Sequence, residues 1–106
     1  MAKYLIRGSY TLDGIKGVLK DGGTGRRRVI EAAVKAAGGR LEAFYFAFGE
    51  DDVVAIVDGL DNVTAAAFAL AVAAGGGARS TTTVLLTPEE VDQATKKTMT
   101  YTAPGR

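Results

Sequence analysis

The sequence predicts an α+β domain whose elements follow in the order strand, helix, strand, strand, helix, strand. Three observations support this prediction. Four short stretches alternate between apolar and polar residues or are rich in β-branched and aromatic ones, as strands are. Two longer stretches repeat apolar residues at helical spacing. Glycine-rich segments separate these stretches, and 106 residues are enough for one domain.

The first strand is predicted over residues 3–10, where apolar and polar side chains alternate. Thr11 or Asp13 can cap the following helix, because a side-chain oxygen at that place accepts from an unpaired backbone N–H. Apolar residues then recur at helical spacing over residues 12–19. The first strand is therefore followed directly by a helix.

Residues 21–25 contain three glycines and break that helix, and a second helical stretch covers residues 26–37. Two strands follow, at residues 40–48 and 52–58, joined by an acidic turn at residues 49–51. The pairing of two consecutive strands predicts an antiparallel hairpin.

Asp61 or Asn62 can cap the next helix, residues 63–74, and the last strand is predicted over residues 78–86. This helix is rich in alanine, and a face of small residues would let it lie close on a sheet. The predicted face consists of Val63, Ala66, Ala67, Leu70, Ala71 and Ala74.

Residues 87–90 read Thr-Pro-Glu-Glu, which is typical of a helix start: a cap, a proline in the first turn and acids near the helix dipole. A short helix is predicted to reach about residue 97, with a frayed tail after it. The chain shows no linker and no repeat. Residues 1–106 are therefore interpreted as a single domain in which residues 88–106 form a C-terminal helix and tail.

The predicted order is that of a ferredoxin-like βαββαβ fold, a four-stranded antiparallel sheet with its helices on one face. Residues 40–48 are apolar on both sides, although the other face of such a sheet has no helix to cover it. Leu41, Ala43, Tyr45 and Ala47 are predicted to point one way, and Phe44, Phe46 and Phe48 the other, after Glu42 at the rim. Exposed apolar patches usually mark interfaces. We therefore expect two copies to pack sheet against sheet, as a homodimeric α+β barrel or a larger homo-oligomer.

The composition excludes several classes of function. The net charge of +1 argues against nucleic acid and anionic membranes as partners. The chain has no cysteine and no histidine, which excludes disulfides, thiolate zinc sites and serine–histidine triads. No apolar run reaches the ~20 residues of a membrane span, and the N-terminal residues do not resemble a secretory signal. We expect a cytoplasmic protein.

Residues 22–58, 61–77 and 81–90 resemble the GYD domain family, because several uncommon blocks occur in the family's order. The family is named for a Gly-Tyr-Asp signature at the hairpin. Gly49, Glu50 and Asp52 match that signature turn, while Asp51 stands where the tyrosine would be. The resemblance implies an α+β barrel, whose relatives include small-molecule monooxygenases, isomerases and haem enzymes. It transfers no catalytic residue and no cofactor to this chain.

A first candidate site is the glycine-rich break before Arg26 and Arg27. Exposed backbone N–H groups, the helix dipole and arginines favour an anion such as phosphate or carboxylate. The alternative interpretation is a helix break with solvated arginines. The segment lacks the GK[ST] ending of a phosphate-binding P-loop.

A second candidate site is the interior of the predicted barrel, where a buried arginine and a tyrosine could orient an anionic or aromatic ligand. Its ligand-binding candidates are Arg7, Tyr10, Tyr45 and Arg79, and the other polar residues of these strands are Ser9 and the threonines Thr81 to Thr83. The alternative is hydrogen-bonded packing within the sheet or salt bridges between subunits.

A third candidate is the acidic turn, where Glu50, Asp51 and Asp52 could bind a hard cation. Successive strand residues point to opposite faces, so three carboxylates do not readily converge. We therefore interpret the segment as a polar turn that protects a sheet edge, and predict no metal site.

Two functions are consistent with these features. The chain binds a small anionic or aromatic molecule, with or without catalysis, or it is a non-catalytic oligomeric regulator or scaffold. The residues point to no particular cofactor.

Overall fold

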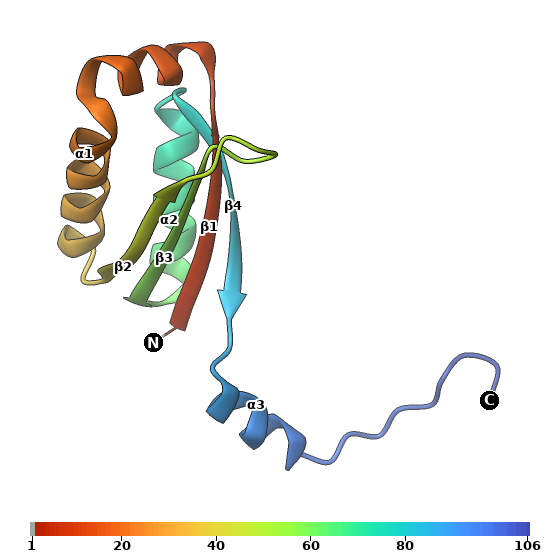
Figure 1. Ribbon diagram of the computed structural model, residues 1–106. Helices are drawn as coiled ribbons and strands as arrows, with labels where there is room; N and C mark the ends of the chain where they lie inside the picture. Colours follow the sequence, from red (N-terminus) through yellow and green to blue (C-terminus); the bar gives the residue numbers. More distant parts are fainter. Residues whose placement is uncertain (1) are drawn as a thin grey trace.

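The computed structural model describes residues 2–106 and has the predicted α+β architecture. Its four strands form one antiparallel sheet in the order β2-β3-β1-β4, with α1 and α2 on the same face (Figure 1). This is the ferredoxin-like arrangement, and it confirms the predicted fold class. The elements are β1 (Ala2–Tyr10), α1 (Leu12–Ala36), β2 (Arg40–Phe46), β3 (Val53–Leu60), α2 (Asn62–Ala74), β4 (Ala78–Leu85) and α3 (Pro88–Thr95).

Helix α1 bends sharply at Gly22, which adopts a φ of 75° and a ψ of 166°. Helical geometry resumes at the next residue, so the break is much shorter than the five residues predicted from sequence. At the bend, a Cβ on Gly23 would lie 3.1 Å from the ring of Phe46, so the glycine lets the backbone rest on that ring. Thr11 caps the helix by accepting from the N–H of Gly14. The bend turns the second half of α1 down along the sheet (Figure 1).

The buried core lies at one end of the sheet. It consists of Tyr4, Val34, Val57, Leu60 and Ala65, and the first of these is only 2% exposed. The hydroxyl of Tyr4 donates a hydrogen bond to the side-chain oxygen of Asn62, at the start of α2. Strands β1 and β3 are therefore fixed to both helices at this end.

The strand register assigns each side chain to a face. Tyr4, Ile6 and Gly8 of β1 stand opposite Val57, Ala55 and Val53 of β3 on the helix side. The face without helices, called the open face below, carries Leu5, Arg7, Ala43, Tyr45, Val54, Ile56, Arg79 and Thr81.

The pairing of β2 with β3 is irregular between Leu41 and Ala43. The extra residue, Glu42, stays on the open face, whereas Leu41 turns to the core. The prediction that Leu41 shares a face with Ala43 and Tyr45 was therefore wrong, because a bulge interrupts the alternation.

The predicted packing face of α2 was also wrong. The helix buries Ala65 and packs Phe68 against the core, while Val63 and Leu70 are 80% and 71% exposed. Since α2 is apolar on nearly all sides, its sequence does not define which side faces the sheet. Phe68, the largest side chain of α2, packs against the core in place of the predicted face of small residues.

Helix α3 and the residues after it extend away from the sheet (Figure 1). The start of α3 has the predicted capping box, in which the side chain of Thr87 accepts from the N–H of Glu90 and the carboxylate of Glu90 accepts from the N–H of Thr87. The extension exposes Leu86, Met99 and Tyr101.

Candidate functional site

A cavity of about 490 Å³ lies between the helix side of the sheet and helices α1 and α2. Pockets for small molecules in proteins usually measure roughly 300–1,000 Å³. The cavity stands where the core of a small domain would normally continue, since the buried cluster around Tyr4 and Val57 fills only the other end.

Side chains leave the cavity unfilled because many of the residues that line it are small. Helix α1 packs over β2 and α2 packs over β4, and the space between them is lined by Gly8, Gly17, Ala33, Ala55, Ala71 and Ala78. A Cβ on Gly17 would have no neighbour within 4 Å. Larger side chains at these positions would fill the space.

The end of the cavity near the start of α1 is closed by backbone. The N–H of Thr11 donates to the carbonyl of Gly77 over 3.0 Å, and the hydroxyl of Thr11 donates to the carbonyl of Gly76 over 2.8 Å. These bonds join the start of α1 to the connection between α2 and β4. Two hydrogen bonds therefore hold this end of the cavity together.

Most of the cavity wall is apolar. The rings of Phe44 and Phe68 and the side chains of Ile6, Val57 and Val72 form much of its surface. Such walls suit a molecule with an apolar or aromatic body.

Three polar side chains line the cavity, and they come from separate elements: Tyr10 ends β1, Arg26 follows the bend in α1, and Ser80 belongs to β4. Gly8 pairs with Ser80, and Tyr10 pairs with Ala78, so Tyr10 and Ser80 lie near the closed end.

Burial raises the pKa of the Tyr10 hydroxyl above its ordinary value; the Arg26 guanidinium beside it opposes this effect, and Asp52 adds to it. The backbone N–H of Tyr10 donates to a carboxylate oxygen of Asp52 over 2.9 Å. Asp52 therefore positions Tyr10, and Tyr10 stays a neutral hydrogen-bond donor at neutral pH.

Arg26 is partly buried, with 28% of its side chain exposed. Its guanidinium faces the carboxylate of Asp21 at 3.8 Å, which is a long contact for an ion pair. Because a guanidinium has five N–H donors, Arg26 retains donors for a further partner.

The structure separates the six candidate residues predicted from sequence. Tyr10 and Arg26, proposed for two different sites, line the same cavity. Arg27 follows Arg26 on α1 but is exposed and does not line the cavity. Tyr45 lies on the open face and is 71% exposed.

Arg7 and Arg79 lie together on the open face. With Ser9, Asp51 and Thr81 they border a shallow hollow of about 230 Å³. This hollow is on the opposite side of the sheet from the cavity, so the interior site predicted from sequence is divided between two faces.

The signature turn holds the hairpin against β1. The N–H of Asp52 donates to the carbonyl of Gly8 over 2.8 Å, and the N–H of Gly49 donates to the carbonyl of Asp51 over 3.0 Å. Glu50 is exposed. Over residues 2–106, no three acidic or other metal-ligating side chains gather into a group that could hold a metal ion.

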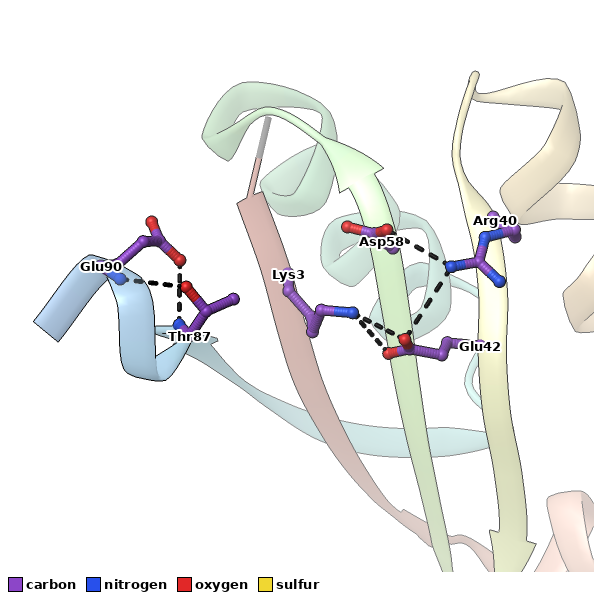
Figure 2. A network of polar contacts seen from close by, with 6 residues as sticks. All are labelled: Lys3, Arg40, Glu42, Asp58, Thr87 and Glu90. Carbon is purple, nitrogen blue, oxygen red and sulfur yellow. Dashed lines mark hydrogen bonds and ion pairs between the residues drawn. The ribbon is translucent and has the colours of Figure 1, made fainter. Parts of the chain in front are cut away.

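A polar network at the other end of the open face was not predicted. Lys3 of β1 reaches across β3 to both carboxylate oxygens of Glu42, at 2.7 and 2.8 Å (Figure 2). Arg40 contacts Glu42 at 3.8 Å and Asp58 at 3.5 Å. The network is partly exposed and ties the edge strand β2 to the sheet.

Among known protein families, the family model described as GYD domain matches residues 4–95. No curated protein and no solved structure matches the chain. None of the helices of residues 2–106 is long and apolar enough to cross a membrane.

Proposed function

This chain belongs to the GYD domain family, and we propose that it is a cytoplasmic homo-oligomer, at least a dimer, that binds a small anionic or aromatic molecule in the cavity between its sheet and helices. The single observation that carries the proposal is the cavity itself. Its volume of about 490 Å³, its apolar wall and its few polar groups are the common features of small-molecule sites.

The location of the small residues also supports the proposal. A domain of 106 residues has a small hydrophobic core. The side chains around an empty apolar space lose the dispersion contacts that a filled space would give them. Glycine and alanine along both helices and the sheet keep this space free, at a cost in stability. A bound molecule would restore the lost contacts.

The open face supports the proposed assembly. Its centre is formed by Leu5, Val54, Ile56 and Tyr45, and no helix covers it. Apolar patches of this kind usually mark an interface. Two copies packed through this face would leave each cavity on the outer side of its own sheet.

A second candidate function is a non-catalytic oligomeric regulator or scaffold. The exposed apolar side of α2, with Val63 and Leu70, favours it, since a helix that is apolar all round is normally covered. In this alternative, assembly through apolar surfaces is the function and the cavity takes no ligand.

A thermal-shift screen separates the two candidates. Small aliphatic acids and small aromatic compounds would be tested on the wild type and on Gly17→Leu, which places a side chain in the cavity. A ligand at about 100 times its dissociation constant adds about 2.7 kcal/mol of stability, enough to raise the melting temperature by several degrees.

We expect at least one compound to raise the melting temperature of the wild type and not that of Gly17→Leu. If no compound does so, or if the two proteins respond equally, the ligand proposal is wrong and the scaffold becomes the better account.

A further inference from the structure

The cavity is polar at one end only. Tyr10 and Ser80 mark the end where β1 finishes and α1 begins, and Arg26 stands beside Tyr10. Along the second half of α1, Arg26 is followed on the cavity side by Val29, Ile30 and Ala33. A bound molecule would therefore meet one charged end and an apolar remainder.

We propose that the cavity selects a molecule with a single negative charge and an apolar body, such as an aliphatic or aromatic monocarboxylate, with its charged group against Arg26 and Tyr10. This inference rests on the proposed function and names the class of ligand for the same site. It chooses the anionic ligand over the neutral aromatic one.

The charge of the wall determines the charge of the ligand. Of the described residues that line the cavity, Arg26 alone is charged. A neutral apolar ligand would desolvate the guanidinium without giving it a partner. A dianion would leave its second charge against apolar walls, which is costly when unpaired. A single carboxylate satisfies the guanidinium and adds no further charge.

Arg26 is available for this role. Its contact with Asp21 is 3.8 Å long, and the side chain of Asp21 is 42% exposed. A carboxylate inside the cavity could accept two N–H groups of the planar guanidinium, a stronger arrangement than the existing contact. The bend at Gly22 lies between Asp21 and Arg26 in the chain, and of these two side chains only Arg26 lines the cavity.

Tyr10 supplies a second donor. Burial raises its pKa, so the hydroxyl is protonated at neutral pH and can donate to an anion. Its backbone is held by Asp52, so the donor is fixed before the ligand arrives.

The test compares two probes with the same apolar body, octanoate and 1-octanol, titrated calorimetrically into the full-length protein at neutral pH. Hydrogen bonds to charged groups contribute about 1.5–3 kcal/mol, which corresponds to about a tenfold to hundredfold difference in affinity. We expect octanoate to bind the wild type at least about tenfold more tightly than octanol.

Arg26→Gln should reduce this preference to near one by weakening octanoate binding, and it should not weaken octanol binding, since the charge that octanol would desolvate is gone. Arg27→Gln is the matched control, because it removes the same charge from the same helix outside the cavity, and it should keep the preference. Tyr10→Phe should lower octanoate affinity severalfold and leave octanol affinity unchanged.

Equal binding of octanoate and octanol to the wild type, lost in Gly17→Leu, would overturn the inference and leave the proposed function standing. A preference for octanoate that survives Arg26→Gln would also overturn it. If neither probe binds and the thermal screen finds no ligand either, both the inference and the proposed function are wrong.

Discussion

The backbones of Gly14 and Gly77 meet at the closed end of the cavity: a Cβ on Gly14 would lie 1.8 Å from the carbonyl oxygen of Gly77. Only a glycine allows α1 to begin this close to the connection between α2 and β4. The contact lies beside the two hydrogen bonds from Thr11 to the same connection. The start of α1 and the connection between α2 and β4 therefore pack directly on each other and together close this end of the cavity.

Gly14→Ala should destabilise the protein by about 1–3 kcal/mol or more. The added methyl group would collide with the backbone carbonyl of Gly77, and relieving the collision requires a backbone shift. Chemical denaturation of the two proteins measures the difference.

Gly17→Ala is the matched control on the same helix. Its Cβ would meet nothing within 4 Å, so the substitution should stabilise by about 0.5–1 kcal/mol through helix propensity. Equal effects of the two substitutions would contradict the close approach at Gly14.

Phe46→Asp and Tyr45→Asp test the two faces of β2 with neighbouring residues. Phe46 packs on the helix side, edge-on to Phe44 at 5.4 Å and stacked on Phe48 at 5.8 Å. An aspartate there should cost several kcal/mol, because it places an unpaired charge among aromatic rings.

Tyr45→Asp should leave each chain folded, since Tyr45 is 71% exposed, but should weaken the proposed assembly through the open face. Circular dichroism reports folding, and size-exclusion chromatography with light scattering reports assembly. A folded Phe46→Asp protein of unchanged stability would refute the burial assignment, and an unchanged oligomer of Tyr45→Asp would refute assembly through this face.

Tyr4→Phe should destabilise by about 1 kcal/mol. The substitution keeps the ring in the core and removes only the hydrogen bond to Asn62, which is exposed and can bind water instead. Urea denaturation measures the change. A loss as large as the ~3–5 kcal/mol typical of removing a whole aromatic ring would show that the hydroxyl does more than make this bond.

Alkaline pH should destabilise the protein partly through Tyr10. Its pKa is raised in the folded state, mainly by burial, so the folded protein holds this proton more tightly than the unfolded chain does. The contribution of Tyr10 to the free energy of unfolding is fully present below its unfolded pKa of about 10. It is lost as pH rises through the pKa of Tyr10 in the folded protein.

Denaturation of the wild type and of Tyr10→Phe at about pH 9 and about pH 11.5 checks this prediction. The informative quantity is the difference in stability loss between the two proteins, because they differ only in the hydroxyl of Tyr10. The wild type should lose more stability than the variant, and parallel losses would contradict a perturbed Tyr10.

The order of the elements could be predicted from sequence, because periodicity and glycine breaks are local signals. Two orientations could not. A bulge at Glu42 turned Leu41 to the core, and α2 is apolar on so many sides that Phe68, rather than a stripe of alanines, decided which side is buried.

The cavity was less predictable than the fold. The chemistry of Tyr10 and Arg26 predicts two different sites, but the folded chain, with α1 bent at Gly22 between them, has both residues on the wall of one cavity. Ser80 was missed altogether. The glycines at positions 14 and 17 lie on one side of a helix, and this spacing is the one sequence signal that could have indicated an open space beside α1.

Native mass spectrometry of gently purified protein tests whether the cavity holds a small molecule. We predict a dimer or larger oligomer of the wild type carrying a small added mass for each chain, released on denaturation, and a Gly17→Leu oligomer of the same size without it. A wild-type oligomer at the bare mass of its chains, or an added mass that Gly17→Leu retains, would show that the cavity holds no such molecule.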